Sequence, residues 1–173
     1  MRVSIGGLPG SGTSTAAYLL AEKTGLEVVS AGEVFRQMAK EQGVSLAKFG
    51  KIAQKDENID RGLDRRMLEI AKKRDTVILE GRLIGALCKK EEIETLAVWL
   101  ESPRDIRAQR ISQREGEDMA KTVQEMAERE NSERTRYLRF YGLDMEDPSI
   151  YDAVIDSHKH NPPEIVELIM EAM

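Results

Sequence analysis

Near its N-terminus the chain reads Gly7-Leu8-Pro9-Gly10-Ser11-Gly12-Thr13-Ser14-Thr15. This stretch follows a short apolar run over residues 2–6, typical of a strand, and precedes a helical pattern over residues 13–23. Glycines let a backbone wrap closely around a phosphate, because they accept a positive φ and carry no Cβ. Backbone amides and the N-terminus of the following helix then supply positive potential. The stretch therefore predicts a phosphate-binding loop between the first strand and the first helix.

The loop departs at one position from the pattern G-x-x-x-x-G-K-[ST] that is typical of nucleotide phosphate binding. Gly7, Gly12 and Ser14 match the pattern, whereas Thr13 stands where the lysine is expected. A lysine there supplies a mobile cation to the phosphates, and a threonine supplies only a hydroxyl. Two interpretations follow: a phosphoryl-transfer enzyme that draws its positive charge from elsewhere, or a regulatory protein that binds a nucleotide without transferring phosphate.

Composition narrows the class of protein. The chain has 173 residues, which suits a single domain with a full core. Its net charge of −5 and aromatic content of 5% argue against a nucleic-acid partner. Cys88 is the only cysteine, which excludes an intrachain disulfide and a cysteine-based metal site.

We also expect neither a membrane span nor a signal peptide. The chain contains no apolar run of about 18 residues, so we expect no membrane span. The opening residues are broken by glycines too early for a signal peptide, which predicts a cytoplasmic location. The helical patterns contain no coiled-coil heptads, and we expect a monomer.

Strand-like and helical patterns alternate along the chain. Strand-like runs are predicted at residues 2–6, 27–30, 76–80, 95–100 and 153–156. Helical patterns are predicted at residues 13–23, 32–73 (a long, mostly helical insertion), 103–114, 119–140 and 163–173. This alternation favours an α/β fold with a parallel sheet flanked by helices. Ligands of such sheets bind at the carboxyl ends of the strands, where the glycine loop, Ser30-Ala31-Gly32 and Glu80-Gly81-Arg82 are expected to meet.

Several arginines are placed for phosphate binding. Arg36 and Arg82 follow strand ends next to glycines, while Arg107, Arg110 and Arg114 share one face of a predicted helix. Arginine suits phosphate because its planar fork donates two charge-assisted hydrogen bonds and stays ionised. Arginines from separate segments could neutralise a polyphosphate donor and a phosphate acceptor, which is most of what phosphoryl transfer requires. For Arg107, and for Arg134 beside Glu130, a solvated helix face is an equally good interpretation.

Two oxygen-bearing side chains are candidate magnesium ligands. Glu80 ends a buried strand, where a carboxylate is costly unless it has a partner. We expect Glu80 to hold Mg²⁺ through water, because this ion keeps several of its own waters. The Ser14 hydroxyl is the expected direct ligand.

With these elements together, the chain resembles the nucleoside monophosphate kinases of the adenylate-kinase-like class, and most of all the short archaeal-type cytidylate kinases. The resemblance covers essentially the whole chain. It rests on six segments. They are the glycine loop, residues 30–36, Glu80-Gly81-Arg82-Leu83, the arginine-rich helical pattern over 108–115, the spacing of Arg129-Glu130 with Glu133 and Arg136, and Tyr151–Asp156. It implies a P-loop NTPase fold with a five-stranded parallel sheet in the order 2-3-1-4-5. One domain over residues 1–173 would comprise a core (1–30, 76–114 and 137–173), a helical acceptor-binding insertion (31–75) and a short helical lid (115–136).

The resemblance also implies a reaction and a set of residues. The reaction is phosphoryl transfer from ATP, with Mg²⁺, to CMP and dCMP. Its implied site residues fall into three groups: ATP binding by Gly7, Leu8, Pro9, Gly10, Ser11, Gly12, Thr13, Ser14 and Thr15; acceptor binding by Ser30, Gly32, Arg36, Gly81 and Arg82; and closure over the transferring group by Arg110, Arg114, Arg129 and Arg136.

Two questions stay open at the level of sequence. Another acceptor, UMP or AMP, is compatible with the same pattern. Asp56, Asp60 and Asp64 recur every four residues on one helical face. They form either a solvated face paired with nearby arginines, or a site where one carboxylate meets the amino group of cytosine.

Overall fold

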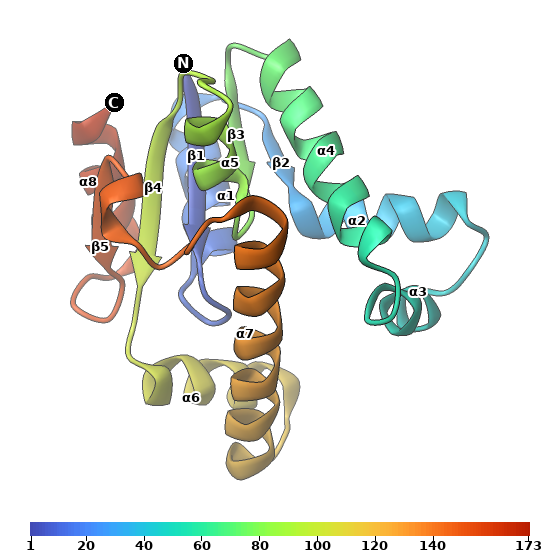
Figure 1. Ribbon diagram of the computed structural model, residues 1–173. Helices are drawn as coiled ribbons and strands as arrows, with labels where there is room; N and C mark the ends of the chain where they lie inside the picture. The colour runs from blue at the N-terminus through green and yellow to red at the C-terminus, as the bar shows by residue number, and fades with distance from the viewer.

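The computed structural model describes residues 1–173, apart from the side chains of Leu46 and Ala47. Its centre is a parallel sheet in the order β2-β3-β1-β4-β5, which confirms the predicted order (Figure 1). The strands are β1 (Arg2–Gly7), β2 (Val28–Ser30), β3 (Val77–Glu80), β4 (Leu96–Glu101) and β5 (Ala153–Asp156). In β1, Ile5 lies opposite Glu80 of β3 and Val98 of β4. The glycine loop therefore leaves the middle of the sheet, beside the ends of its neighbours.

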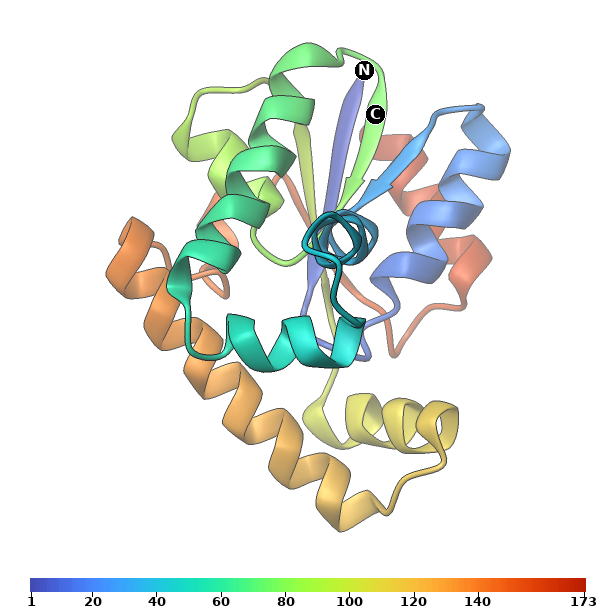
Figure 2. The ribbon, with the colours of Figure 1, turned by 90° about the vertical axis from the view of Figure 1, so that its right-hand side faces the viewer.

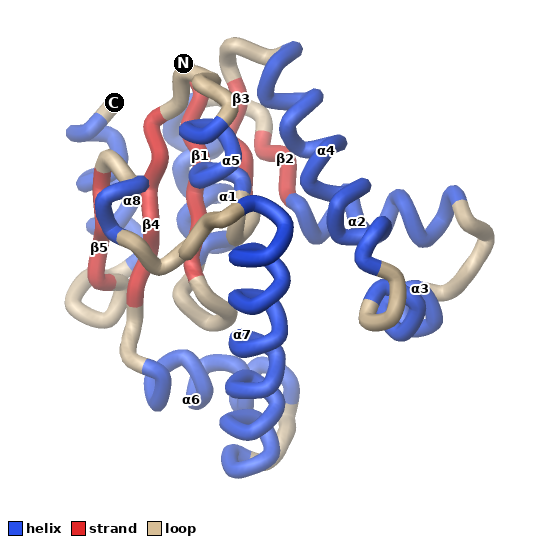
Figure 3. Tube along the Cα trace, viewed as in Figure 1, coloured by secondary structure: helices blue, strands red, loops and turns tan.

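Helices occupy most of the connections (Figure 3). They are α1 (Thr13–Thr24), α2 (Ala31–Glu41), α3 (Leu46–Ala53), α4 (Glu57–Lys73), α5 (Ile84–Lys90), α6 (Arg104–Glu115), α7 (Met119–Tyr141), the 3-10 helix η1 (Pro148–Ile150) and α8 (Pro162–Ala172). Every predicted helical segment is present. The helices α5 and η1 were not predicted. In α5 the residues from Ile84 to Cys88 are all buried, so no polar face marks it as a helix in the sequence.

Helices cover both faces of the sheet (Figure 2). Side chains alternate along each strand, so Ile78 faces α1 and α8 while Val77 and Leu79 face α4 and α5. Both faces are thus buried, which explains why the strands read as continuous apolar runs.

Two helical groups extend beyond the carboxyl ends of the strands. One comprises α2, α3 and the start of α4; the other comprises α6 and the long α7, which passes close to α4 (Figures 1 and 2). Each group has a small apolar cluster of its own, around Met38 and Phe49 in the first and around Ile111 and Met126 in the second. The space between them lies in front of the glycine loop.

No helix in the described part of the chain is both long enough and apolar enough to cross a membrane.

Candidate active site

The glycine loop lies between β1 and α1, as predicted. Gly10 has a φ of +83°, and a Cβ there would lie 2.7 Å from the carbonyl oxygen of Arg107. At Gly7 a Cβ would lie 2.6 Å from the carbonyl oxygen of Leu100. Both positions therefore require glycine. The loop leads directly into the N-terminus of α1, where free amides favour an anion.

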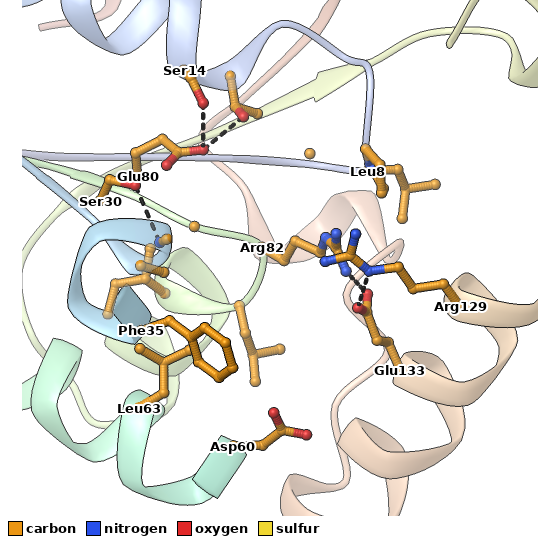
Figure 4. A pocket seen from close by; sticks show the side chains of 18 of the residues that line it. Leu8, Ser14, Ser30, Phe35, Asp60, Leu63, Glu80, Arg82, Arg129 and Glu133 are labelled. Carbon is orange, nitrogen blue, oxygen red and sulfur yellow. Dashed lines mark hydrogen bonds and ion pairs between the residues drawn. The ribbon is translucent and has the colours of Figure 1, made fainter. Parts of the chain in front are cut away.

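The side chain at the lysine position of the loop bonds to a carboxylate. The Thr13 hydroxyl donates to Oε1 of Glu80 at 2.8 Å, and the Ser14 hydroxyl donates to the same atom at 3.3 Å. Glu80 is the last residue of β3, and the pairing of β1 with β3 holds it beside the loop. A strand end and a helix start thus place three side-chain oxygens together at one end of the site (Figure 4).

A cleft of about 1400 Å³ opens in front of the loop, between the group α2–α4 and α7. All of the predicted site residues except Ser11 and Arg110 line this cleft. The lining residues among them are Gly7, Leu8, Pro9, Gly10, Gly12, Thr13, Ser14, Thr15, Ser30, Gly32, Arg36, Glu80, Gly81, Arg82, Arg114, Arg129 and Arg136. Predicted donor-binding and acceptor-binding residues therefore share one continuous space.

Two guanidinium groups meet on the α7 side of the cleft. Arg82 forms an ion pair with Glu133, and Nε of Arg129 lies 3.0 Å from Oε1 of the same carboxylate. Burial lowers the pKa of Arg82 to about 10, and repulsion from Arg129 adds to that shift. Two guanidinium groups thus share one carboxylate, which leaves an excess positive charge that an anionic phosphate would neutralise (Figure 4).

The comparisons with known proteins agree with this geometry. The model of the cytidylate kinase-like family matches residues 2–159. The chain belongs to this family. A cytidylate kinase of Methanococcoides burtonii is 44% identical, with 100% of this chain and 97% of the relative covered. A cytidylate kinase of Methanocaldococcus jannaschii is also 44% identical, with 100% of this chain and 97% of the relative covered. A cytidylate kinase of Pyrococcus horikoshii is 42% identical, with 99% of this chain and 87% of the relative covered.

Solved structures agree on the fold. Shikimate kinase from Aquifex aeolicus superposes with a TM-score of 0.65 at 19% identity, over 99% of this chain and 95% of that structure. An uncharacterised protein from Eubacterium ventriosum gives a TM-score of 0.74 at 18% identity, over 99% and 96%. At such identities the likeness shows that this member of the cytidylate kinase-like family shares the architecture of P-loop kinases.

Ser11 and Arg110 are the predicted site residues that lie outside the cleft. Ser11 is buried, and its hydroxyl donates to the carbonyl oxygen of Leu8 at 2.7 Å, which fixes the loop from behind. Arg110 donates to the carbonyl oxygens of Gly10 (3.0 Å) and Ser157 (2.9 Å). In this family member Arg110 therefore ties the glycine loop to the segment after β5.

A second arginine supports the loop, and the sequence left its role undecided. Arg107 is only 4% exposed; it forms an ion pair with Glu130 of α7 and donates to the carbonyl oxygen of Pro9 at 3.2 Å. Arg107 is thus a buried link between the loop and α7, and the interpretation as a solvated face does not apply to it.

The three aspartates of α4 have different surroundings. Asp56 caps the start of the helix, where its carboxylate accepts from the amide of Asn58 at 3.0 Å. Asp60 and Asp64 line the cleft. Oδ2 of Asp60 lies 3.0 Å from Nε of Arg136, and Tyr141 donates to Oδ2 of Asp64 at 2.8 Å. Burial raises the pKa of Asp64 to about 6.

Sequence reasoning did not single out Phe35, Leu63 or Tyr137, which also line the cleft. Each lies on a helical face that an apolar pattern alone assigns to the core. The available indication was that each is the direct neighbour of a residue singled out in the sequence: Phe35 of Arg36, Leu63 of Asp64 and Tyr137 of Arg136.

The residues near the loop fit a magnesium ion bound together with substrate phosphates. Ser14 and Glu80 offer oxygens 3.3 Å apart at the edge of the cleft, with room beside them for water and phosphate. Mg²⁺ prefers such sites, with one or two protein oxygens, over a cage of protein ligands. The described residues contain no cluster of three or more acidic, histidine or cysteine side chains that could hold a metal.

Proposed function

We propose that this chain transfers the γ-phosphoryl group of ATP to CMP, giving ADP and CDP. The observation that carries the proposal is the single cleft that joins the glycine loop to the paired guanidinium groups of Arg82 and Arg129. Full-length identity of 44% to archaeal cytidylate kinases supports CMP as the acceptor. We include dCMP as a second acceptor on the strength of the sequence resemblance.

The transfer is an in-line displacement. A phosphate oxygen of CMP attacks the γ-phosphorus, a new P–O bond forms, and the bond to the bridging oxygen breaks with its electron pair leaving on ADP. Such a reaction is accelerated mainly by alignment and by neutralisation of the phosphate charges. The loop amides and the start of α1 hold the donor phosphates, and Arg36 and Arg82 hold the acceptor phosphate. Arg114, Arg129 and Arg136 then close over the transferring group.

Magnesium belongs to the same proposal. When bound, Mg²⁺ neutralises charge on the β- and γ-phosphate oxygens. Ser14 would be its direct protein ligand, and Glu80 would hold it through water. The hydrogen bonds from Thr13 and Ser14 keep the Glu80 carboxylate turned toward that position.

We further propose that the molecule works as three parts: a core (1–30, 76–114 and 137–173), an acceptor-binding insertion (31–75) and a lid (115–136). The separate apolar cluster around Met38 and Phe49 supports the division of the insertion from the core. The cluster of Ile111 with Met126 joins the lid to α6, so the lid would move about that contact. Closure of the two outer parts would exclude water, so that the phosphoryl group passes to CMP and not to solvent. A monomeric state and a cytoplasmic location stay predictions.

The test is ADP formation from Mg·ATP with CMP, dCMP, UMP, AMP and GMP as separate acceptors. Rapid turnover with CMP and much slower turnover with the purine nucleotides would support the proposal. Faster turnover with UMP or AMP than with CMP would show that the proposed acceptor is wrong, while the kinase activity would stand. Binding of ATP without turnover on any acceptor would favour a regulatory nucleotide-binding protein, the alternative that Thr13 raises.

A further inference from the structure

The cleft has an apolar wall at the end away from the glycine loop. Phe35 and Leu63 line this end, while Ser14 and Glu80 mark the other (Figure 4). The ring of Phe35 is braced by Phe49, with ring centroids 4.9 Å apart. An aromatic face held in this way can stack on any nucleobase. If the acceptor phosphate lies at Arg36 and Arg82, this wall is where the acceptor base extends.

One carboxylate lies beside that wall and can still accept hydrogen bonds. Asp60 projects into the cleft near Phe35 and Leu63 (Figure 4). Its Oδ2 lies 3.0 Å from Nε of Arg136, yet within the part of the chain that the structure describes neither of these two buried atoms has a hydrogen-bond partner. The charge of Arg136 therefore holds Asp60 in place while the acceptor positions on the carboxylate stay available.

We propose that the Asp60 carboxylate accepts a hydrogen bond from the exocyclic amino group of cytosine and so separates CMP from UMP. The inference rests on the proposed function. Cytosine presents an amino donor at the position where uracil presents a carbonyl oxygen. A carboxylate accepts from the amino group of cytosine. Opposite uracil, the same carboxylate would face a second acceptor, so that UMP is actively disfavoured.

The neighbouring aspartates do not offer the same chemistry. Asp56 lies outside the cleft and its carboxylate is used in capping α4. Asp64 also lines the cleft, but Oδ2 of its carboxylate accepts from the Tyr141 hydroxyl, so one of its two oxygens is already engaged within the protein. Asp60 is the member of the trio that combines a place beside Phe35 with a free acceptor, and it is therefore the specificity-determining residue.

The test compares Asp60→Asn with the matched control Asp56→Asn, which keeps a good capping residue on the same helix. For each protein we would measure kcat/KM and, without ATP, the dissociation constants of CMP and UMP. An asparagine amide can donate to the carbonyl oxygen of uracil. We expect Asp60→Asn to lower the CMP-to-UMP ratio in both measurements by roughly tenfold to a hundredfold, with the KM for ATP unchanged. Asp56→Asn should keep the wild-type ratio.

The outcomes separate this inference from the proposed function. A wild-type enzyme that shows no preference for CMP would refute the function itself. A wild-type preference that survives unchanged in Asp60→Asn, in both turnover and binding, would overturn the role of Asp60 alone. Asp60→Ala serves as a second variant if the asparagine protein does not fold. It should reduce the CMP preference, because it removes the acceptor for the cytosine amino group and also the repulsion from the uracil carbonyl.

Discussion

Thr13 changes the charge pattern of the phosphate-binding loop. A lysine at this position would bring a cation to the donor phosphates; Thr13 instead donates its hydroxyl to Glu80 at 2.8 Å. Positive charge comes to the cleft from arginines on other elements, with Arg82 and Arg129 sharing Glu133. The sequence revealed the missing lysine, but the partner of Thr13 lies 67 residues away and became visible only in the folded chain.

We predict that Thr13→Val slows phosphoryl transfer while the protein stays folded. Valine has nearly the same shape but donates no hydrogen bond, so Glu80 keeps only the longer contact from Ser14 at 3.3 Å. A hydrogen bond to a charged group contributes about 1.5–3 kcal/mol, which predicts a fall in kcat of roughly tenfold to a hundredfold. Steady-state ADP formation with CMP is the measurement.

Thr24 offers the matched control for this substitution. It lies at the other end of α1, where its hydroxyl donates to the carbonyl oxygen of Leu20 at 2.7 Å. Thr24→Val should keep the wild-type kcat. Equal kcat values for Thr13→Val and the wild type would show that the bond to Glu80 has no part in the reaction.

At the scale of elements, short apolar runs that alternate with helical patterns were enough to place every strand. Each predicted strand boundary lies within one residue of the observed one, because both faces of the sheet are buried and the apolar runs end where burial ends. The helix α5 escaped prediction for the opposite reason, since its buried residues carry no polar face. The glycine loop was recognised, but its support from Arg107 and Arg110 was not, because those contacts cross between distant elements.

We predict that the glycine loop tolerates a methyl group far less well than an ordinary helix end does. Gly10 and Gly142 both have a positive φ, +83° and +64°. A Cβ at Gly142 meets open space, whereas a Cβ at Gly10 would lie 2.7 Å from the carbonyl oxygen of Arg107. Gly142→Ala should therefore cost only the backbone penalty of about 1–2 kcal/mol. Gly10→Ala should cost more and should also weaken ATP binding.

Urea unfolding and ATP titration of the two glycine variants give the comparison. The difference between them isolates the contact with Arg107, because the backbone penalty is shared. If Gly10→Ala matched Gly142→Ala in stability and bound ATP like the wild type, the loop would not depend on its close approach to α6.

At the scale of the whole molecule, polar pairs join the insertion to the long helix α7. Arg136 faces Asp60, Tyr141 donates to Asp64, and Arg139 forms an ion pair with Glu57. All of these pairs connect α4 to α7. The sequence placed acidic residues on one face of α4 and basic residues on α7, but it could not show that the two faces meet. The contacts between the insertion and α7 therefore include a group, Asp64, whose charge changes with pH.

We predict that Asp64→Asn becomes progressively more stable, relative to the wild type, as the pH rises. Burial raises the pKa of Asp64 from 3.8 to about 6, so between these values the folded protein binds more protons than the unfolded chain. Wild-type stability therefore falls as the pH rises through this window. Asparagine lacks the carboxylate but still offers an amide oxygen to the Tyr141 hydroxyl.

At about 1.4 kcal/mol per pKa unit, the free energy of unfolding of Asp64→Asn should gain roughly 2–3 kcal/mol on the wild type between about pH 4 and pH 7. Urea unfolding followed by Trp99 fluorescence measures both proteins at each pH. Tyr141→Phe provides the complementary variant, because removing the hydrogen bond that lowers the Asp64 pKa should move the fall in stability to higher pH. A difference between Asp64→Asn and the wild type that stays constant over this range would mean that Asp64 is already ionised in the folded protein. The contacts between α4 and α7 would then supply enough positive charge to keep it so.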